Sequence, residues 1–527
     1  MSAARSGEAA SVSGGLAVPA VVAAPAAASG TAGGTTRPLL ALGGIFLAAM
    51  MAGLNNRVGT LALADVRGAL GFGLDDASWL GTAYAAGELV AMPFASWFAI
   101  TLTLRRFHLG LLLASVAVAL LLPWVRDLHL LLALRALQGL ACGAMIPLLM
   151  SAALRFLPAP VRLHGLALYA MTATFAPNVA MWLAAQWTDA LHDWRLVYWQ
   201  IVPLAAIAGA LVARGLPREP IQAGRFPRGN WLGLACGATG LALLAVGLDQ
   251  GVRLDWFRSP LVTCALAAGA GCTALYLLTE WYHPEPFMEL RLLARRNLGL
   301  GFAVFVCLLV VMLSGSALPS GFLARTWGYR ALQGMPIGLI VGLPQMVLGS
   351  LVALLLYRRW VDARWVFACG LALLALSCLL AARLTPDWMW RQFAWVQALQ
   401  ALGQPMTVVP LLFLATSVVR PQEGPYVSGI INALRVFGTL LGGAGLGQFL
   451  AVRERFHTSL LLDHVGRLGG ALGDAPLPAG LGGMVARQAF VLATADAYRV
   501  LGWFALALIL VVLRLQYIPA PTVAAPR

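Results

Sequence analysis

The residues of this sequence that could do chemistry are a few ionisable side chains inside long apolar stretches. They are Arg57, Glu88, Arg135 and Arg435, with Asp496 and Arg499 nearer the end of the last stretch. A charge in hydrocarbon costs about 3 kcal/mol or more, so each of these residues indicates a functional site by default. Catalytic patterns are absent from the sequence, because the seven histidines are scattered and no glycine-rich phosphate loop follows a strand. We therefore expect no enzyme, no cofactor and no metal site, and an ion gradient as the energy source.

Glu88 is the candidate for proton coupling, together with Arg57 and Arg135. Glu88 lies about ten residues from the outer end of its predicted span, hence roughly 15 Å deep, and Arg57 lies just inside the outer end of the first span. If they meet, protonation of Glu88 breaks an ion pair and biases inward-open against outward-open packing. The alternative is a permanent structural ion pair. Arg135 either senses a carboxylate or an anionic substrate group, or donates structurally to backbone carbonyls.

The fifth predicted span has the features of a flexible helix beside a binding cavity. Pro177 and Asn178 would kink or loosen the helix, because proline frees a carbonyl that must find another partner. Such a helix suits a gate. Tyr84, Phe175 and Trp182 are expected to line a cavity for flat apolar ligands, with a position facing lipid or the membrane interface as the alternative.

The elements that must position these residues are transmembrane helices. With 60% hydrophobic and 11% charged residues, the chain of 527 residues is not a water-soluble globule. Apolar stretches long enough to cross a bilayer recur from Pro38 to Leu515. They predict fourteen spans at 38–62, 78–100, 107–125, 128–156, 163–187, 195–214, 229–249, 259–281, 297–320, 332–357, 364–383, 391–418, 427–451 and 488–515.

Charge places the predicted spans in the bilayer and excludes some partners. The net charge of +15 does not indicate nucleic acid, because the arginines lie singly or in pairs between apolar spans and form no basic face. With both termini inside, the inner loops are rich in arginine, whereas the outer loops balance arginine against aspartate, so we expect a multi-pass cell-membrane protein with cytoplasmic termini. The seven cysteines all fall in apolar spans without metal-ligand spacing, which argues against disulfides and zinc.

A faint internal repeat predicts two similar halves. Leu137-Gln138 with Met145 and Pro147 is echoed by Leu399-Gln400 with Met406 and Pro410. The predicted fold is therefore an all-α polytopic membrane protein with two six-helix bundles and two inserted helices. The predicted parts are a disordered tail at 1–37, a bundle at 38–214, a linker with two spans at 215–296, a bundle at 297–515 with an outer loop at 452–487, and a tail at 516–527.

Several motifs occur in an order that resembles a known transporter family. Arg135-Ala136-Leu137-Gln138-Gly139 is similar to the Arg-x-x-Gln-Gly motif of the fourth major facilitator helix. The outer-loop string 248–251 and the pattern Asn432-x-x-Arg435-x-x-Gly438 agree with it. From about Leu40 to Leu515 the chain resembles the EmrB/QacA-like fourteen-span drug:proton antiporters of the major facilitator superfamily.

The resemblance implies a function, partners and further site residues. It implies proton-coupled efflux of amphipathic drugs across a bacterial inner membrane by alternating access, with an EmrA-like periplasmic adaptor and an outer-membrane channel as partners. Three buried arginines against one buried glutamate favour organic anions as substrates. The expected cavity then comprises Asn55, Tyr84, Gln138, Phe175, Asn178, Trp182, Asn432 and Arg435. The expected gating and packing positions are Gly139, Pro177 and Gly438.

Departures from the family pattern keep a second function open. The first span reads Leu54-Asn55-Asn56-Arg57 where the family usually carries an acidic residue, and residues 180–185 replace the antiporter motif of the fifth span. A solute importer or uniporter on the same fold is therefore the alternative. A non-transporting sensor or scaffold is disfavoured, because it would gain nothing from burying Glu88 and three arginines.

Overall fold

The chain folds into a bundle of long helices. The computed structural model describes residues 37–157, 159–420, 422–472 and 480–520. Within these ranges the regular elements are all helical, and fourteen helices are long and apolar enough to cross a membrane. The predicted all-α polytopic class with fourteen spans is therefore confirmed. Most of the two predicted tails, at 1–37 and 516–527, lies outside the described residues.

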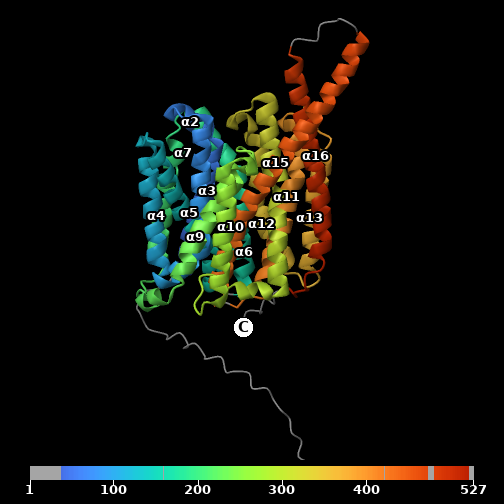
Figure 1. Cartoon of the computed structure of the whole chain (residues 1–527). Helices are drawn as coiled ribbons and strands as arrows, with labels where there is room; N and C mark the ends of the chain where they lie inside the picture. The colour runs from blue at the N-terminus through green and yellow to red at the C-terminus, as the bar shows by residue number, and fades with distance from the viewer. Residues whose placement is uncertain (1–36, 158, 421, 473–479, 521–527) are drawn as a thin grey trace, which may run out of the picture. The chain divides into compact units, whose positions relative to one another are not determined.

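The first six spanning helices form one bundle. They are α1 (Pro38–Leu61), α3 (Leu74–Thr101), α4 (Leu104–Leu121), α5 (Leu128–Phe156), α6 (Ala159–Ala185) and α8 (Ile201–Gly215). α1 packs against α5, α6 and α8, and α3 packs against α5. Two short helices, α2 (Leu63–Leu70) and α7 (Leu196–Trp199), lie at one end of this bundle (Figure 1). A π-helical turn at Gln186–Ala190 follows α6.

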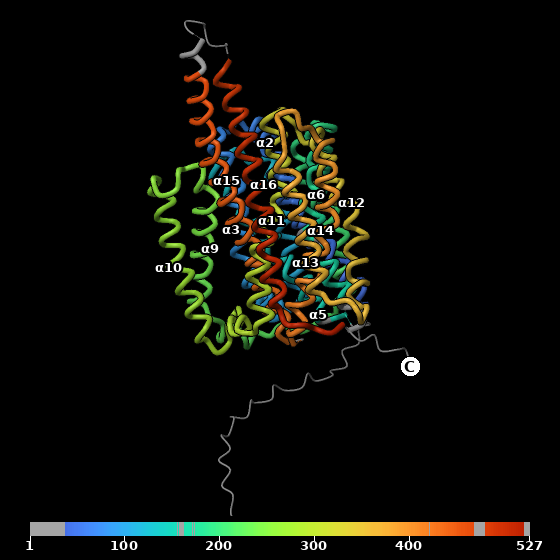
Figure 2. Tube along the Cα trace, turned by 90° about the vertical axis from the view of Figure 1, so that its right-hand side faces the viewer, coloured from blue at the N-terminus to red at the C-terminus, as the bar shows by residue number. Residues whose placement is uncertain are grey.

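The last six spanning helices form the second bundle, and two inserted helices lie beside both. The second bundle comprises α11 (Arg296–Trp327), α12 (Ala331–Leu356), α13 (Ala363–Ala381), α14 (Trp390–Thr416), α15 (Gly424–Leu472) and α16 (Leu481–Val512). The inserted helices are α9 (Trp231–Gly251) and α10 (Pro260–Tyr282). α9 packs against α10, α3 and α15, so the inserted pair touches both bundles at one edge (Figure 2).

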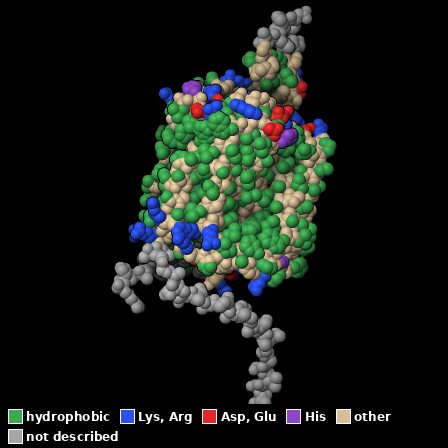
Figure 3. All heavy atoms as spheres, turned by 90° about the vertical axis from the view of Figure 1, so that its left-hand side faces the viewer, with side chains coloured by type: hydrophobic (Ala, Val, Ile, Leu, Met, Phe, Trp, Pro, Cys, Tyr) green, Lys and Arg blue, Asp and Glu red, His purple; other side chains and the backbone are tan. Residues whose placement is uncertain are grey.

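The bundle has two ends with different features. We call the end where α1 begins and α16 ends the terminal face, and the opposite end the hairpin face. At the terminal face the backbone after α16 joins the start of α11, because the Asn297 amide donates to the Gln516 carbonyl at 3.2 Å. Between the two ends, hydrophobic side chains cover the flank seen in Figure 3, as expected for a surface that faces lipid.

The hairpin face carries a helical projection that the sequence did not predict. The segment 452–487 was expected as a loop, but α15 continues to Leu472 and α16 already begins at Leu481, while residues 473–479 lie outside the described part. Both helices rise beyond the ends of their neighbours (Figures 1 and 2). Hydropathy falls where a helix leaves the bilayer, so the apolar window ended before the helix did.

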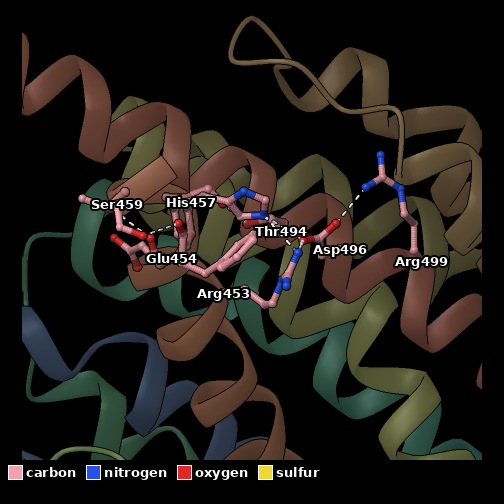
Figure 4. Close-up of polar contacts among 10 residues, drawn as sticks. Arg453, Glu454, His457, Ser459, Thr494, Asp496 and Arg499 are labelled. Carbon is pink, nitrogen blue, oxygen red and sulfur yellow. Dashed lines mark hydrogen bonds and ion pairs between the residues drawn. The ribbon is translucent and has the colours of Figure 1, made fainter. Parts of the chain in front are cut away.

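Ion pairs join the two helices of this projection where it leaves the bundle. The Asp496 carboxylate on α16 accepts hydrogen bonds from Arg453 at 2.6 Å and from Arg499 at 2.7 Å (Figure 4). His457 Nε2 lies 2.8 Å from the same carboxylate. On the other side of α15, Glu454 pairs with Arg325 of α11. At the base of the projection, α15 is thus tied to α16 and to α11.

Glycines bring α3 and α5 into direct backbone contact. A Cβ atom added at Gly139 of α5 would lie 2.1 Å from the Tyr84 carbonyl oxygen, and one added at Gly87 of α3 would lie 2.1 Å from the Ala136 carbonyl oxygen. A Cβ atom at Gly143 would lie 2.7 Å from the Glu88 carbonyl oxygen. Small residues at a crossing let helix backbones approach closely in a membrane. This crossing therefore holds the α3 backbone at Glu88 against α5.

We expect Gly139→Ala to destabilise the protein, because the new methyl group has no room against the Tyr84 carbonyl. Overpacking of this kind costs about 1–3 kcal/mol or more. Gly81→Ala is the matched control, since Gly81 also lies in α3 and a Cβ atom there meets nothing within 4 Å. Thermal unfolding of the purified variants should show a clearly lower transition for Gly139→Ala than for Gly81→Ala. Equal transitions would contradict the packing described.

Candidate functional site

Glu88 lies in the middle of α3 and is 7% exposed. Its carboxylate accepts a hydrogen bond from the Asn56 side-chain amide at 2.8 Å. The Arg57–Glu88 ion pair considered from the sequence is not formed, because consecutive residues of a helix point about 100° apart and Asn56 faces α3. Arg57 of α1 and Arg435 of α15 still act on Glu88 electrostatically. Glu88 therefore responds to charges on both bundles.

Arg135 of α5 lies under the rings of two tyrosines. Its guanidinium carbon is 4.7 Å from the Tyr84 ring centroid and 5.6 Å from the Tyr198 ring centroid. Nη1 donates to Gln138 Oε1 at 2.6 Å, and the side chain is buried. A cation over aromatic faces gains up to about 2 kcal/mol when desolvated. The arginine charge is thus stabilised without a carboxylate within ion-pairing distance in the described part of the chain.

The same region contains buried polar atoms without protein partners. They are both amide atoms of Asn55, Nε of Arg135 and Nε2 of Gln138. A buried unsatisfied polar group costs about 1–3 kcal/mol, so such atoms normally bind water or a ligand. Tyr84, whose hydroxyl lies 3.5 Å from the Ala52 carbonyl, places its ring beside them. This polar cluster of the first bundle is therefore suited to hold water or a polar ligand group.

Hydrogen bonds connect the two bundles near the level of Glu88. Tyr169 of α6 donates to Asn432 Oδ1 of α15 at 2.8 Å. Arg435 Nη1 donates to Thr172 Oγ1 at 3.1 Å. The Asn432 amide donates in turn to the Ser428 carbonyl at 2.8 Å. Asn432 and Arg435, expected in the cavity, thus contact the opposite bundle.

The remaining predicted residues of α6 are placed differently from one another. Asn178 is buried and donates to the Thr174 carbonyl at 2.6 Å, and a Cβ atom on Gly338 of α12 would lie 2.3 Å from the Asn178 carbonyl oxygen. α6 stays helical through Pro177, and Phe175 is half-buried. Trp182 is 38% exposed, so its ring is not enclosed between the bundles. Tryptophan commonly takes such exposed positions at the membrane interface.

Gly438 belongs to packing within the second bundle. A Cβ atom there would lie 3.1 Å from Leu309 of α11 and 3.3 Å from Val306. The residue therefore sits on the face of α15 that packs against α11. Gly139, by contrast, lies in the α3–α5 crossing of the first bundle. Both glycines lie at close helix contacts.

Contacts close the space between the bundles at both faces. At the hairpin face, Arg330 before α12 pairs with Asp189 at 2.8 Å and with Asp65 at 2.7 Å, and these hydrogen bonds raise the pKa of Arg330. At the terminal face, the Ser428 hydroxyl donates to the Pro147 carbonyl at 2.5 Å. The His164 and Tyr357 rings, one from each bundle, also lie 5.5 Å apart there. The central polar residues are therefore enclosed in this conformation.

Sequence reasoning missed several residues of this region. Asn56 was not predicted as a site residue because its charged neighbour Arg57 was chosen, although an asparagine in an apolar span is itself unusual. Tyr198, Thr172 and Tyr169 gave no separate signal, because hydroxyl-bearing residues are common in membrane helices. Among the described residues, no three His, Cys, Asp or Glu side chains are grouped as metal ligands would be. The site is therefore one of hydrogen bonds and charges.

Comparisons with known proteins agree with this architecture. A sequence model described as the Major Facilitator Superfamily matches residues 45–331. The chain is 24% identical to the fatty acid resistance protein FarB of Neisseria gonorrhoeae, over 80% of this chain and 82% of FarB. It is also 24% identical to the multidrug export protein EmrB of Escherichia coli K12, over 80% and 81% of the two chains.

Solved structures show the same fold. The proton:xylose symporter XylE superposes with a TM-score of 0.58 at 12% identity, covering 92% of this chain and 97% of XylE. The human organic anion transporter MFSD10 gives a TM-score of 0.53 at 13% identity, covering 89% and 99%. Identities this low support the fold alone.

Replacement of Arg135 should lower stability in a graded way. In Arg135→Ala, Gln138 loses its donor and the Tyr84 and Tyr198 rings lose the cation, so we expect a loss of about 2–3 kcal/mol. Arg135→Lys keeps a charge over the rings and should lose less. Tyr198→Phe keeps the aromatic face and serves as the control, with stability near that of the unmodified protein. Thermal unfolding in detergent measures the order of stability of these variants. An Arg135→Ala protein as stable as Tyr198→Phe would rule out the stabilising role of Arg135.

Proposed function

This chain belongs to the major facilitator superfamily, and from that premise we propose that it exports amphipathic organic compounds in exchange for protons by alternating access. As a major facilitator it is a multi-pass secondary transporter rather than an enzyme. The observation that carries the proposal is Glu88, a buried carboxylate in mid-membrane that interacts with charges on both bundles. The names of the relatives EmrB and FarB support multidrug or fatty-acid-like substrates.

Glu88 couples protons to the packing of the two bundles. Ionised Glu88 on α3 attracts Arg435 on α15, which also donates to Thr172 of α6. Attraction across the interface favours closed packing. Protonation removes the negative charge of Glu88, so Arg435 keeps only its hydrogen bond to Thr172. The attraction between the bundles weakens, and they separate more readily. Asn56 accommodates both states, because an amide can donate to a carboxylate or accept from a carboxylic acid.

An excess of positive charge around Glu88 favours substrates with an anionic group. Arg57, Arg135 and Arg435 oppose the single carboxylate of Glu88 in this region. An anionic group would be attracted to the arginines and would compete with ionised Glu88 for them. Anion export removes negative charge from the cytoplasm, and proton entry adds positive charge to it. A membrane potential that is negative inside therefore favours both movements. Each elementary charge contributes about 2.3 kcal/mol per 100 mV of membrane potential.

The terminal face is assigned to the cytoplasm. Arginine side chains gather along the lower rim of the flank in Figure 3, whereas the upper rim mixes basic and acidic side chains. Under the positive-inside rule this distribution supports an orientation with both termini in the cytoplasm and the hairpin face outside the inner membrane. The α15–α16 projection then extends into the periplasm. It is the part of the chain available to an EmrA-like adaptor that leads to an outer-membrane channel.

Alternation requires the contacts at each face to open in turn. At the hairpin face, Arg330 holds Asp65 and Asp189 of the first bundle, and this ion-pair cluster must break when the site opens outward. At the terminal face, the contact of Ser428 with Pro147 must break for inward opening. A partly exposed ion pair contributes about 1 kcal/mol and a single hydrogen bond about 1 kcal/mol, so either contact can break.

Cysteine labelling tests the orientation. In a variant without the seven native cysteines, Ser459→Cys on the projection should react with a membrane-impermeant maleimide added to spheroplasts. Gln222→Cys, in the exposed loop before α9, should react only after the membrane is permeabilised. The reverse pattern would overturn the assignment of the terminal face.

Glu88→Gln should abolish uphill export while ligand binding is retained. Glutamine keeps the shape and the hydrogen bond with Asn56 but cannot carry the proton, so binding should also lose its pH dependence. Glu88→Asp should keep part of both activities. Glu280→Gln is the control, since Glu280 is a buried carboxylate of α10 outside the bundle interface and is bonded to Asn230 at 2.8 Å. Export should be measured in proteoliposomes with an imposed pH gradient, and full accumulation by Glu88→Gln would refute this coupling role.

A further inference from the structure

The second bundle contains a ladder of buried amides. Gln345 Nε2 of α12 donates to Gln404 Oε1 of α14 at 2.7 Å, and Gln404 Nε2 donates to Gln400 Oε1 at 3.4 Å. Gln400 Nε2 donates to the hydroxyls of Ser314 and Ser377 at 2.9 and 3.1 Å. We call Gln345, Gln404 and Gln400 the amide ladder. All three side chains are at most 2% exposed, although amides are costly to bury without partners.

One end of the amide ladder is open. Gln345 Oε1 is buried and has no hydrogen-bond partner among the residues that the structure describes. The other end is fixed, because both serine hydroxyls donate in turn to backbone carbonyls, Ser314 to Val311 at 2.6 Å and Ser377 to Val396 at 3.1 Å. A buried acceptor left unpaired costs about 1–3 kcal/mol, which a donor from water or a ligand would recover. No water-sized space adjoins this atom in the closed packing, so one more polar group can reach the open end only when the bundles separate.

The open end faces the first bundle. Gly338, Gly342 and Gln345 follow at spacings of four and three residues, so they share one face of α12. That face packs on α6, since Cβ atoms on Gly338 and Gly342 would lie 2.3 Å from the Asn178 carbonyl oxygen and 3.3 Å from its Cβ atom. Gln345 is near the middle of α12, as Glu88 is near the middle of α3. The ladder therefore ends between the bundles, at mid-membrane.

The ladder accepts either a donor or an acceptor. Each glutamine amide has one donating and one accepting end, and a serine hydroxyl does both. If all three amides rotate together and the serines donate to Gln400, the open atom of Gln345 becomes a donor. This reversal keeps the number of hydrogen bonds along the ladder but breaks the serine bonds to the Val311 and Val396 carbonyls, so the open end takes a donor at a lower cost than an acceptor. None of the side chains in it is ionisable, so a charged group would find no counter-charge there.

We propose that the open end of the amide ladder, Gln345 backed by Gln404 and Gln400, is a subsite for an uncharged hydrogen-bonding group of the transported molecule, such as a hydroxyl, carbonyl or amide. The inference deepens the proposed export function and rests on it. The first bundle then supplies charge through Arg135 and Glu88, and the second supplies Arg435 and the neutral hydrogen bonds of the ladder. A molecule with an ionised head and an uncharged polar group would engage both bundles at once.

Equilibrium binding tests the subsite separately from transport. The full-length protein in lipid nanodiscs is titrated with dodecanoate and with monohydroxydodecanoates whose hydroxyl is near, midway along or far from the carboxylate, with empty nanodiscs as background. In Gln345→Met, which keeps the side-chain volume, at least one hydroxylated acid should lose about tenfold in affinity, or about 1.4 kcal/mol. Dodecanoate itself should change less than about twofold.

The control is Gln397→Met, a buried glutamine of α14 outside the ladder, whose amide donates to the Gly315 carbonyl at 3.0 Å. It should retain the affinities of the unmodified protein. If Gln345→Met does not fold, Gln404→Met removes the next member of the ladder and should show the same selective loss. Equal losses for all probes, or no loss for any, would overturn the subsite. Selective loss without uphill export in proteoliposomes would instead overturn the export function and leave the subsite standing.

Discussion

The backbone contact between α3 and α5 is the constraint on which the site depends. Gly87, Gly139 and Gly143 leave no room for a methyl group between the two helices, so their separation and relative rotation are fixed. That rotation sets Tyr84 over Arg135 and holds Glu88 on the side of α3 that Asn56 can reach. A carboxylate and a guanidinium in hydrocarbon are tolerated only when such partners are positioned in advance. The glycines therefore act on function through geometry, although none of them carries a functional group.

The two bundles share one architecture but stabilise their buried polar side chains in different ways. In the first, charges are stabilised by tyrosine rings and an asparagine, and several polar atoms keep no protein partner. In the second, the position that the internal repeat aligns with Arg135 is the neutral Gln397, and its neighbours form a ladder of amides. Neutral hydrogen bonds are weaker and less sensitive to pH than charge pairs. The buried carboxylate Glu88 thus lies in one half, whereas no member of the amide ladder in the other half is ionisable.

Much of the fold and a smaller part of the site could be predicted from the sequence. Fourteen spans follow from hydropathy alone, and Glu88 and Arg135 stand out because charges are rare in hydrocarbon. The partners of these residues depend on helix rotation, which apolar sequences leave undetermined, so Arg57 was paired with Glu88 where Asn56 makes the contact. Trp182 was placed in the cavity because an aromatic ring suits both a ligand and a lipid interface. Gln345 and Gln404 were missed because a neutral amide is less conspicuous than a charge.

The continuity of α15 has a mechanical consequence. This single helix carries Asn432 and Arg435 at the bundle interface and runs without interruption to Leu472 at the far end of the projection. From Arg435 to Leu472 the rise of an α-helix gives an arm of roughly 55 Å. A tilt of about 10° at the interface would displace its tip by roughly 10 Å. The helix is thus a lever, with the pair at Arg453 and Asp496 bracing its arm, and it would report the state of the buried site far beyond the membrane surface.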